Sequence, residues 1–143
     1  MKHKETDFEP QTLGEHIKKR RLSLKLYQRE VAERLGVDSN TVLNWEKGLT
    51  VDPPIKRFPA IMVFLGYNPF PAPTTLSERM LAIRRIKGWT MREAAQAIGV
   101  DPCTWQMWES TGTIKWRRYQ MKIETLFAEL RFSPSAFDWY SRG

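Results

Sequence analysis

The stretch DSNTVLNWEK, residues 38–47, combines side chains whose types and spacing suit contacts with nucleic-acid bases. In a helix, Val42 and Trp45 would lie on one apolar face. The opposite face would present four side chains suited to a DNA groove: Ser39, Asn40, Leu43 and Asn44. An asparagine amide can pair with N6 and N7 of adenine, a serine hydroxyl with either kind of base edge, and a leucine with a thymine methyl group. The stretch therefore predicts a helix that reads bases in the major groove; the alternative is an ordinary solvated helix face.

Other side chains near this stretch suit contacts with phosphate. Gln28 opens the preceding helix, where its amide and the helix N-terminus would together hold a phosphate group. Lys47, Lys56 and Arg57 would add charge contacts beside it. The chain has 23 Lys and Arg residues against 16 Asp and Glu residues, a formal net charge of +7, which favours a polyanionic partner such as double-stranded DNA.

The sequence offers little support for other classes of function. His16 has no acid and nucleophile at a catalytic spacing, and no Gly-rich phosphate loop occurs, so we expect no enzyme, no catalytic residue and no cofactor. Cys103 has no His or Cys neighbour at metal-ligand spacing, so no metal site is expected. As the single cysteine, it excludes an intramolecular disulfide, which makes the cytoplasm the default location. The longest apolar run, AIMVFLG, is far shorter than the roughly 20 residues that span a bilayer, so we expect no membrane contact.

The chain contains an internal repeat. Residues 12–46 align with residues 75–109 at a constant offset of 63, without gaps, and 13 of the 35 positions are identical. Each copy begins with a capping box, TLGE or TLSE, and carries an alanine where two helices would cross and a glycine four residues later. These residues are Ala32 and Gly36, then Ala95 and Gly99. Two copies in one register predict an all-α fold of two tandem small helical bundles.

Caps, prolines and apolar stripes divide the chain into five segments. We expect an N-terminal tail at 1–11, a first helical domain at 12–67, a Pro-rich linker at 68–74, a second domain at 75–132 and an aromatic tail at 133–143 that docks on the second repeat. Asp38 and Asp101 are expected to cap the third helix of each copy. Tyr27 stands where the second copy has the capping residue Thr90, so we expect a weaker cap there.

The connection between the copies carries two further signals. The fourth helix of the first copy, about residues 54–65, is apolar nearly all round. It is expected to bury one face against its own repeat and one against the other repeat or a second chain; the alternative is simply a well-buried helix. The linker NPFPAPT favours an extended, semi-rigid spacer of roughly 20 Å. With two domain radii added, the two reading helices would lie about one DNA turn, near 34 Å, apart.

Residues 12–67 resemble the Cro and phage-repressor, or XRE-type, helix-turn-helix family, and residues 75–130 resemble it less well. The residues that carry the resemblance are Arg21, Gln28, Ala32, Gly36, Val37, Trp45, Glu46 and Gly48. The resemblance implies helical domains that bind operator DNA, with an ion pair that ties the first helix to the end of the third. The implied pairs are Arg21 with Glu46 and Arg84 with Glu109, both structural rather than DNA-contacting.

The second copy departs from the family pattern. Three polar positions of the first copy become Met91, Cys103 and Met107. Gln106 and Ser110 remain as polar readers of bases. Trp105 replaces Val42 in the apolar face, which we expect to push its helix outward or to expose part of the indole.

Two interpretations of the second copy stay open. It enters a groove, held mainly by phosphate contacts from Arg92, Lys115, Arg117 and Arg118, or it forms an interaction surface that uses Met107 and Trp105. The whole chain is expected to be a transcription regulator that binds double-stranded DNA sequence-specifically, at a non-palindromic site, or at a palindromic one if two chains pair through the apolar fourth helix. The alternative is a protein-interaction module, an antitoxin or regulator scaffold, in which the second copy binds a partner protein.

Overall fold

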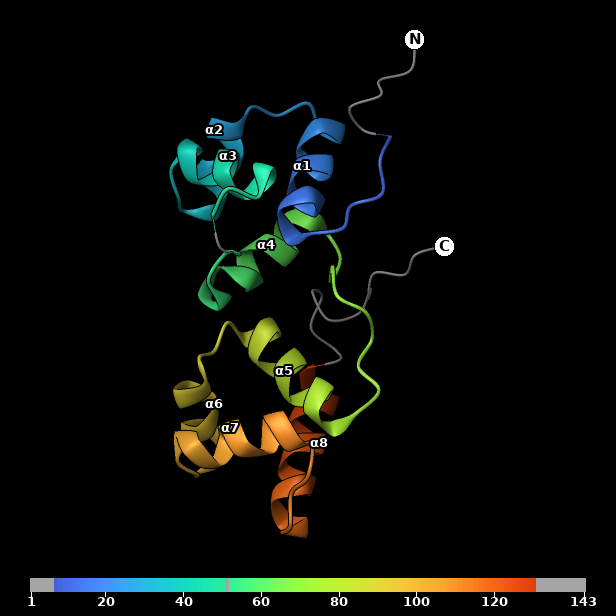
Figure 1. The fold of residues 1–143 in the computed structure, drawn as a ribbon, viewed down its shortest axis with the longest axis vertical. Helices are drawn as coiled ribbons and strands as arrows, with labels where there is room; N and C mark the ends of the chain where they lie inside the picture. The colour runs from blue at the N-terminus through green and yellow to red at the C-terminus, as the bar shows by residue number, and fades with distance from the viewer. Residues whose placement is uncertain (1–6, 51, 131–143) are drawn as a thin grey trace.

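The computed structural model describes residues 7–50 and 52–130, and every regular element in these two ranges is a helix (Figure 1). The elements in chain order are α1 (Leu13–Ser23), α2 (Gln28–Leu35), α3 (Ser39–Lys47), the short 3-10 helix η2 (Ile55–Arg57), α4 (Phe58–Leu65), α5 (Leu76–Lys87), α6 (Met91–Ile98), α7 (Pro102–Thr111) and α8 (Arg117–Leu130). The predicted all-α fold class is therefore confirmed. The expectation that the aromatic tail docks on the second repeat falls on residues outside the described ranges.

Threonine side chains cap three of these helices. The hydroxyl oxygens of Thr12, Thr75 and Thr90 accept the backbone amide three residues later, at 3.1, 3.1 and 3.2 Å, at the start of α1, α5 and α6. Each bond satisfies one of the amides that a helix N-terminus leaves without an intrahelical partner. The capping signals of the sequence therefore mark the true start of these helices.

The N-terminal caps of α2, α3 and α7 differ in their hydrogen bonds. Asp38 accepts the Thr41 amide at 2.8 Å before α3, whereas Asp101 precedes α7 without a side-chain capping bond. Tyr27 makes no side-chain capping bond before α2, so α2 keeps only the reverse bond, in which the Tyr27 amide donates to Glu30 Oε1 at 2.8 Å. The weaker cap expected at Tyr27 is present, and a second weak cap occurs at Asp101.

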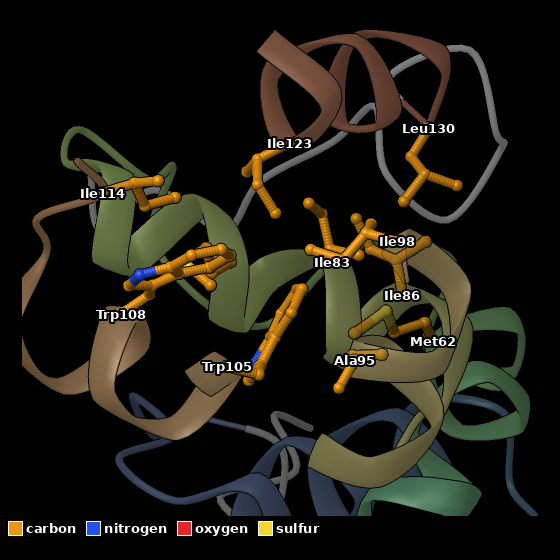
Figure 2. Packing of buried hydrophobic residues seen from close by; sticks show 12 residues of the cluster. Met62, Ile83, Ile86, Ala95, Ile98, Trp105, Trp108, Ile114, Ile123 and Leu130 are labelled. Carbon is orange, nitrogen blue, oxygen red and sulfur yellow. The ribbon is translucent and has the colours of Figure 1, made fainter. Parts of the chain in front are cut away.

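Two hydrophobic clusters form the core. The first cluster joins α1 to α4 and contains Leu13, Ile17, Val31, Ala32, Leu35, Val42, Trp45, Ile61, Phe64 and Leu65. The second cluster joins α5 to α8 and contains Met80, Ile83, Ile86, Ala94, Ala95, Ile98, Trp105, Trp108, Ile114, Ile123, Leu130 and also Met62 of α4 (Figure 2). Each cluster holds its own group of helices together, and α4 contributes to both.

α4 is the shared element because its apolar side chains point to opposite sides. Ile61 packs in the first cluster and its neighbour Met62 in the second, and both are 1 % exposed. Burying one such side chain stabilises a fold by about 1.5–3 kcal/mol, so both contacts matter. The expectation that the fourth helix buries two faces is confirmed, and the second face lies against the same chain.

The two helical groups meet at what we call the α4–α5 junction, formed by η2 and α4 on one side and α5 with the start of α6 on the other. Phe58 stacks on Phe70 with ring centroids 5.6 Å apart, and both rings border both clusters. Lys56 Nζ lies 3.3 Å from Glu93 Oε1 across the junction. α4 packs directly on α5, so the two helical groups are in contact with each other.

The junction also fixes how the helix pairs are arranged. In the view of Figure 1 the α2–α3 pair and the α6–α7 pair both lie on the left side of the molecule, one above the other. α4 and α5 lie between them in the same view. The α2–α3 pair and the α6–α7 pair therefore belong to one body and lie on the same side of it in this view.

Candidate nucleic-acid interface

α2 and α3 meet at a sharp turn that the sequence requires. Gly36 ends α2 with φ +73°, a left-handed conformation that glycine adopts without strain, and the Val37 amide closes the turn on the Ala32 carbonyl at 3.0 Å. Ala32 is 3 % exposed at the crossing. Asp38 then starts α3 three residues after the end of α2. This is a helix-turn-helix arrangement, in which the second helix projects from the body.

α3 is held against α1 by an unusually close backbone approach. A Cβ atom placed on Gly14 would lie 1.9 Å from the Trp45 carbonyl oxygen, so only glycine fits this position of α1. Val42 is fully buried and Trp45 is 7 % exposed on the inner face of α3. The inner face of α3 is therefore held against the core, and its outer face points away from the core.

The outer face of α3 carries the predicted base-reading side chains. Ser39 and Asn40 are exposed, and Leu43 and Asn44 are half-buried. Within residues 7–50 and 52–130, the side chains of Ser39, Asn40 and Asn44 take part in no hydrogen bond of the structure. A row of unpaired hydroxyl and amide groups on one fixed face can donate to and accept from the edges of base pairs.

A buried carboxylate network ties α3 to α1 and α2. Arg21 donates from Nε to Glu46 Oε2 at 2.7 Å and from Nη2 to Oε1 at 2.9 Å. The Glu46 side chain is 2 % exposed, and it accepts a third bond at 3.1 Å from the Gln28 amide. The ion pair implied by the family resemblance is thus present. The side-chain amide of the predicted phosphate ligand Gln28 donates one of its two N–H hydrogens to Glu46. The second N–H hydrogen can therefore donate to an external acceptor.

The other predicted phosphate ligands of the first helical group lie in different places. Lys47 is exposed at the end of α3. Lys56 pairs with Glu93 across the α4–α5 junction, and Arg57 donates from Nη1 to the Leu35 carbonyl at the end of α2, at 3.4 Å. Within the described residues, the side chain of Lys47 makes neither an ion pair nor a hydrogen bond, unlike those of Lys56 and Arg57. Lys56 and Arg57 are engaged in holding the body together.

Two residues that the sequence interpretation missed lie beside the outer face of α3. Tyr27 is 63 % exposed, and the Arg29 guanidinium lies over its ring, 4.4 Å from the centroid. Arg29 and Ser39 line one groove between α2 and α3. Arg29 is identical in the two copies, and its counterpart Arg92 is a predicted phosphate ligand. The alignment of the two copies therefore indicates Arg29 as a phosphate ligand as well.

The second helix pair differs from the first in how its network is completed. Arg84 donates to both oxygens of Glu109 at 2.9 Å. Trp105 is fully buried, and its Nε1 donates to Glu109 Oε1 at 2.8 Å; Figure 2 shows its ring within the second cluster. The expectation that Trp105 exposes part of its indole is wrong, because the N–H has an acceptor in Glu109 and the ring is buried in the core. Trp105 therefore takes no part in any interaction surface.

The outer face of α7 is less polar than that of α3. Cys103, Gln106 and Ser110 are exposed, and Met107 is 55 % exposed. Ser110 bonds back to the Met107 carbonyl at 3.1 Å. Gln106 is thus the predicted base reader whose side chain stays unpaired within the described part of the chain.

The predicted phosphate ligands of the second helical group are all exposed. Arg92 lies in the first turn of α6, and Lys115, Arg117 and Arg118 lie around the start of α8. Arg118 also contacts the Tyr119 ring, 4.8 Å from its centroid. One of the four cations therefore lies at the start of α6, and the other three lie around the start of α8.

Comparison with known proteins gives one match. Residues 17–70 match a family model described as Helix-turn-helix, which spans most of α1, all of α2, α3 and α4, and the start of the linker. This match supports a helix-turn-helix of the XRE type, DNA binding and a role in transcription regulation. No curated protein and no solved structure matches the chain.

No helix in residues 7–50 and 52–130 has the length and apolar character needed to cross a bilayer. The same residues contain no group of three or more His, Cys, Asp or Glu side chains arranged to hold a metal ion.

Proposed function

Starting from the helix-turn-helix of residues 17–70, we propose that this protein binds double-stranded DNA sequence-specifically and regulates transcription, with α3 in the major groove. The observation that carries the proposal is the outer face of α3, where Ser39, Asn40 and Asn44 are unpaired while the inner face is locked by Val42 and Trp45. The backbone that carries these polar groups is already held in place, so binding has to order only their side chains. Asn40 and Asn44 would read adenine, and Leu43 would contact a thymine methyl group.

Contacts with phosphate would position α3 in the groove. Gln28 would donate its second N–H hydrogen, together with the free amides at the start of α2, to one phosphate. Arg29 lines a groove with Ser39 at the start of α3, Lys47 lies at the end of α3, and both would hold phosphates that flank the groove. Phosphate contacts release counterions, so binding should weaken steeply as salt rises.

We further propose that residues 75–132 are a degenerate second copy of the domain formed by residues 12–67, joined to it by residues 68–74. Its α6–α7 pair would add supporting contacts through Arg92, Lys115, Arg117 and Arg118, with Gln106 near a base. The location of both helix pairs on one side of Figure 1 supports their use on one duplex. The two copies run head to tail, so a single chain would prefer a non-palindromic site.

Pairing of two chains through α4 has less support than the sequence indicated. Ile61 and Met62 are both buried within one chain, and the exposed apolar side chain that α4 retains in the described structure is Val63, 74 % exposed. A second copy of the chain would therefore have to pair through another surface.

The test is selection of bound sequences from random duplex DNA with wild-type protein, followed by binding of the selected duplex to an Asn40→Ala, Asn44→Ala double variant. We expect one enriched motif, and a loss of sequence preference in the double variant with salt-dependent binding retained. A Gln96→Ala variant, at an exposed polar position of α6 that the proposal does not use, serves as the control and should keep the preference. No enrichment, with no duplex bound even in dilute buffer, would refute the proposal and favour the protein-interaction alternative.

A further inference from the structure

The loop between α7 and α8 presents an exposed tryptophan among three cations. Trp116 is 63 % exposed, and Lys115, Arg117 and Arg118 around it are also exposed. Within the described residues, none of these three cations forms a salt bridge with a carboxylate. We call these four residues the KWRR patch. It joins an apolar ring of large area to three positive charges that nothing in the described structure neutralises.

The KWRR patch is held rigidly. Ile114, two residues before Trp116, is 2 % exposed in the second cluster. The Gln120 side chain donates to the Ile114 carbonyl, and the Trp116 carbonyl accepts the amides of Tyr119 at 3.0 Å and Gln120 at 3.2 Å. The backbone of Trp116 is therefore fixed on both sides while its indole stays in solvent. Such a side chain loses little conformational freedom when it enters a partner.

The residues of the patch are poor choices for the start of a helix. Trp116 offers no capping oxygen, whereas Thr75 and Thr90 cap the starts of α5 and α6. Arg117 and Arg118 occupy the first turn of α8, where the helix dipole disfavours positive charge. Local choices that oppose folding are expected where a surface serves binding. The cations at the start of α8 and the exposed ring of Trp116 therefore add little to folding, although Arg118 also donates to the Tyr119 hydroxyl at 3.2 Å.

We propose that Trp116 enters a base step of duplex DNA as a wedge, with Lys115, Arg117 and Arg118 on the flanking phosphates, and that it kinks the duplex at that step. The inference rests on the proposed DNA-binding function. Apolar side chains that insert between base pairs unstack the step and bend the duplex, and base stacking on aromatic rings is favourable for every base. DNA is favoured over a protein partner because the patch brings together three cations without a carboxylate partner on a chain whose formal net charge is +7, which suits a polyanion.

The test compares wild-type protein with Trp116→Ala and Trp116→Phe on a duplex of about 30 base pairs that contains TA steps and carries a donor and an acceptor dye at its two ends. TA steps kink most easily, so they are the expected target. We expect wild type to raise the energy transfer between the dyes, Trp116→Phe to keep part of the rise, and Trp116→Ala to abolish it. We also expect Trp116→Ala to bind at least about fivefold more weakly. Val63→Ala, which removes an equally exposed apolar group from α4, is the control and should behave as wild type.

Failure of this inference can be told apart from failure of the proposed function. If wild type and Trp116→Ala bind the duplex equally tightly with equal energy transfer, DNA binding stands and the wedge is refuted. If no variant binds any duplex, both proposals fall. If Trp116→Ala instead changes the sedimentation of the free protein, the ring serves a contact between chains and the wedge is again refuted.

Discussion

The indole nitrogen of Trp105 lies 2.8 Å from Glu109 Oε1 and donates to a carboxylate that already accepts two bonds from Arg84. In the first helical group the same third bond comes from Gln28, on a different helix, to Glu46. The second group has Met91 in place of Gln28 and Trp105 in place of Val42. The donor lost at one position is replaced at the other, so both carboxylates keep three hydrogen bonds from two partners.

Replacing Trp105 with Phe should remove this bond. We expect the free energy of unfolding to fall by about 2 kcal/mol, since the acceptor is a charged, largely buried group. Urea unfolding followed by circular dichroism gives the value. Trp108→Phe is the matched control, because Trp108 is also buried but its side chain takes part in no hydrogen bond within the described residues. Equal losses in the two variants would show that ring volume, not the bond to Glu109, sets the cost.

Replacing Arg21 with Met should leave the Glu46 carboxylate buried without its cation. We expect a loss of about 3–5 kcal/mol in unfolding free energy, because the Glu46 side chain is 2 % exposed and water cannot take the place of the guanidinium. Adding Glu46→Gln to this variant removes the buried charge and should recover part of the loss. Arg29→Met is the control on an exposed arginine and should change stability little. A milder loss for Arg21→Met than for the double variant would contradict this account of the ion pair.

Gly88→Ala should loosen the α4–α5 junction. A Cβ atom on Gly88 would lie 2.9 Å from Pro59 Cγ, and the residue has φ +71°. Gly99→Ala is a matched control, since Gly99 has φ +83° and no atom within 4 Å of the added Cβ. We expect about 1 kcal/mol of destabilisation for Gly99→Ala from backbone strain alone, and clearly more for Gly88→Ala. Urea unfolding of the two variants checks the difference, and equal values would show that Pro59 moves aside without cost.

The Glu93 carboxyl should titrate below the ordinary glutamate range. The Thr90 backbone amide, then Lys56 across the junction, lower its pKa, although the side chain is exposed. A pKa lower in the folded than in the unfolded state contributes stability that is complete above the ordinary value and is lost as pH falls through the folded value. We expect Lys56→Ala to raise the pKa of Glu93 and to leave that of Glu78, which is lowered by Thr74, unchanged. Carboxyl chemical shifts followed by NMR between pH 2 and pH 6 would reveal either result.

Much of the fold could be predicted because its signals are local. Thr75, Thr90 and Asp38 stand where helices begin, and Gly36 stands where α2 ends. A cap or a left-handed glycine depends on a few neighbouring residues, so the sequence carries the information directly. The outer face of α3 followed from the spacing of Val42 and Trp45 for the same reason.

The relations between distant segments could not be predicted in the same way. Nothing local reveals that the Trp105 ring becomes fully buried in a cluster formed by several helices, or that Lys56 pairs with Glu93, 37 residues away. The role of Gly14 shows the same limit. Its close approach to the Trp45 carbonyl depends on how α1 and α3 cross, and the second copy has Ser77 there, whose hydroxyl donates to the Glu109 carbonyl instead.

The position of Met62 has a consequence for how the molecule comes apart. Met62, a side chain from the last helix of the first group, completes the interior of the second group, whereas the buried residues of the first cluster all come from residues 13–65. Removal of α4 would take Ile61 from one interior and Met62 from the other in a single step. We therefore expect residues 12–130 to unfold in one cooperative transition. A fragment expressed from residue 75 onward should have a lower free energy of unfolding than the same residues have within the intact chain.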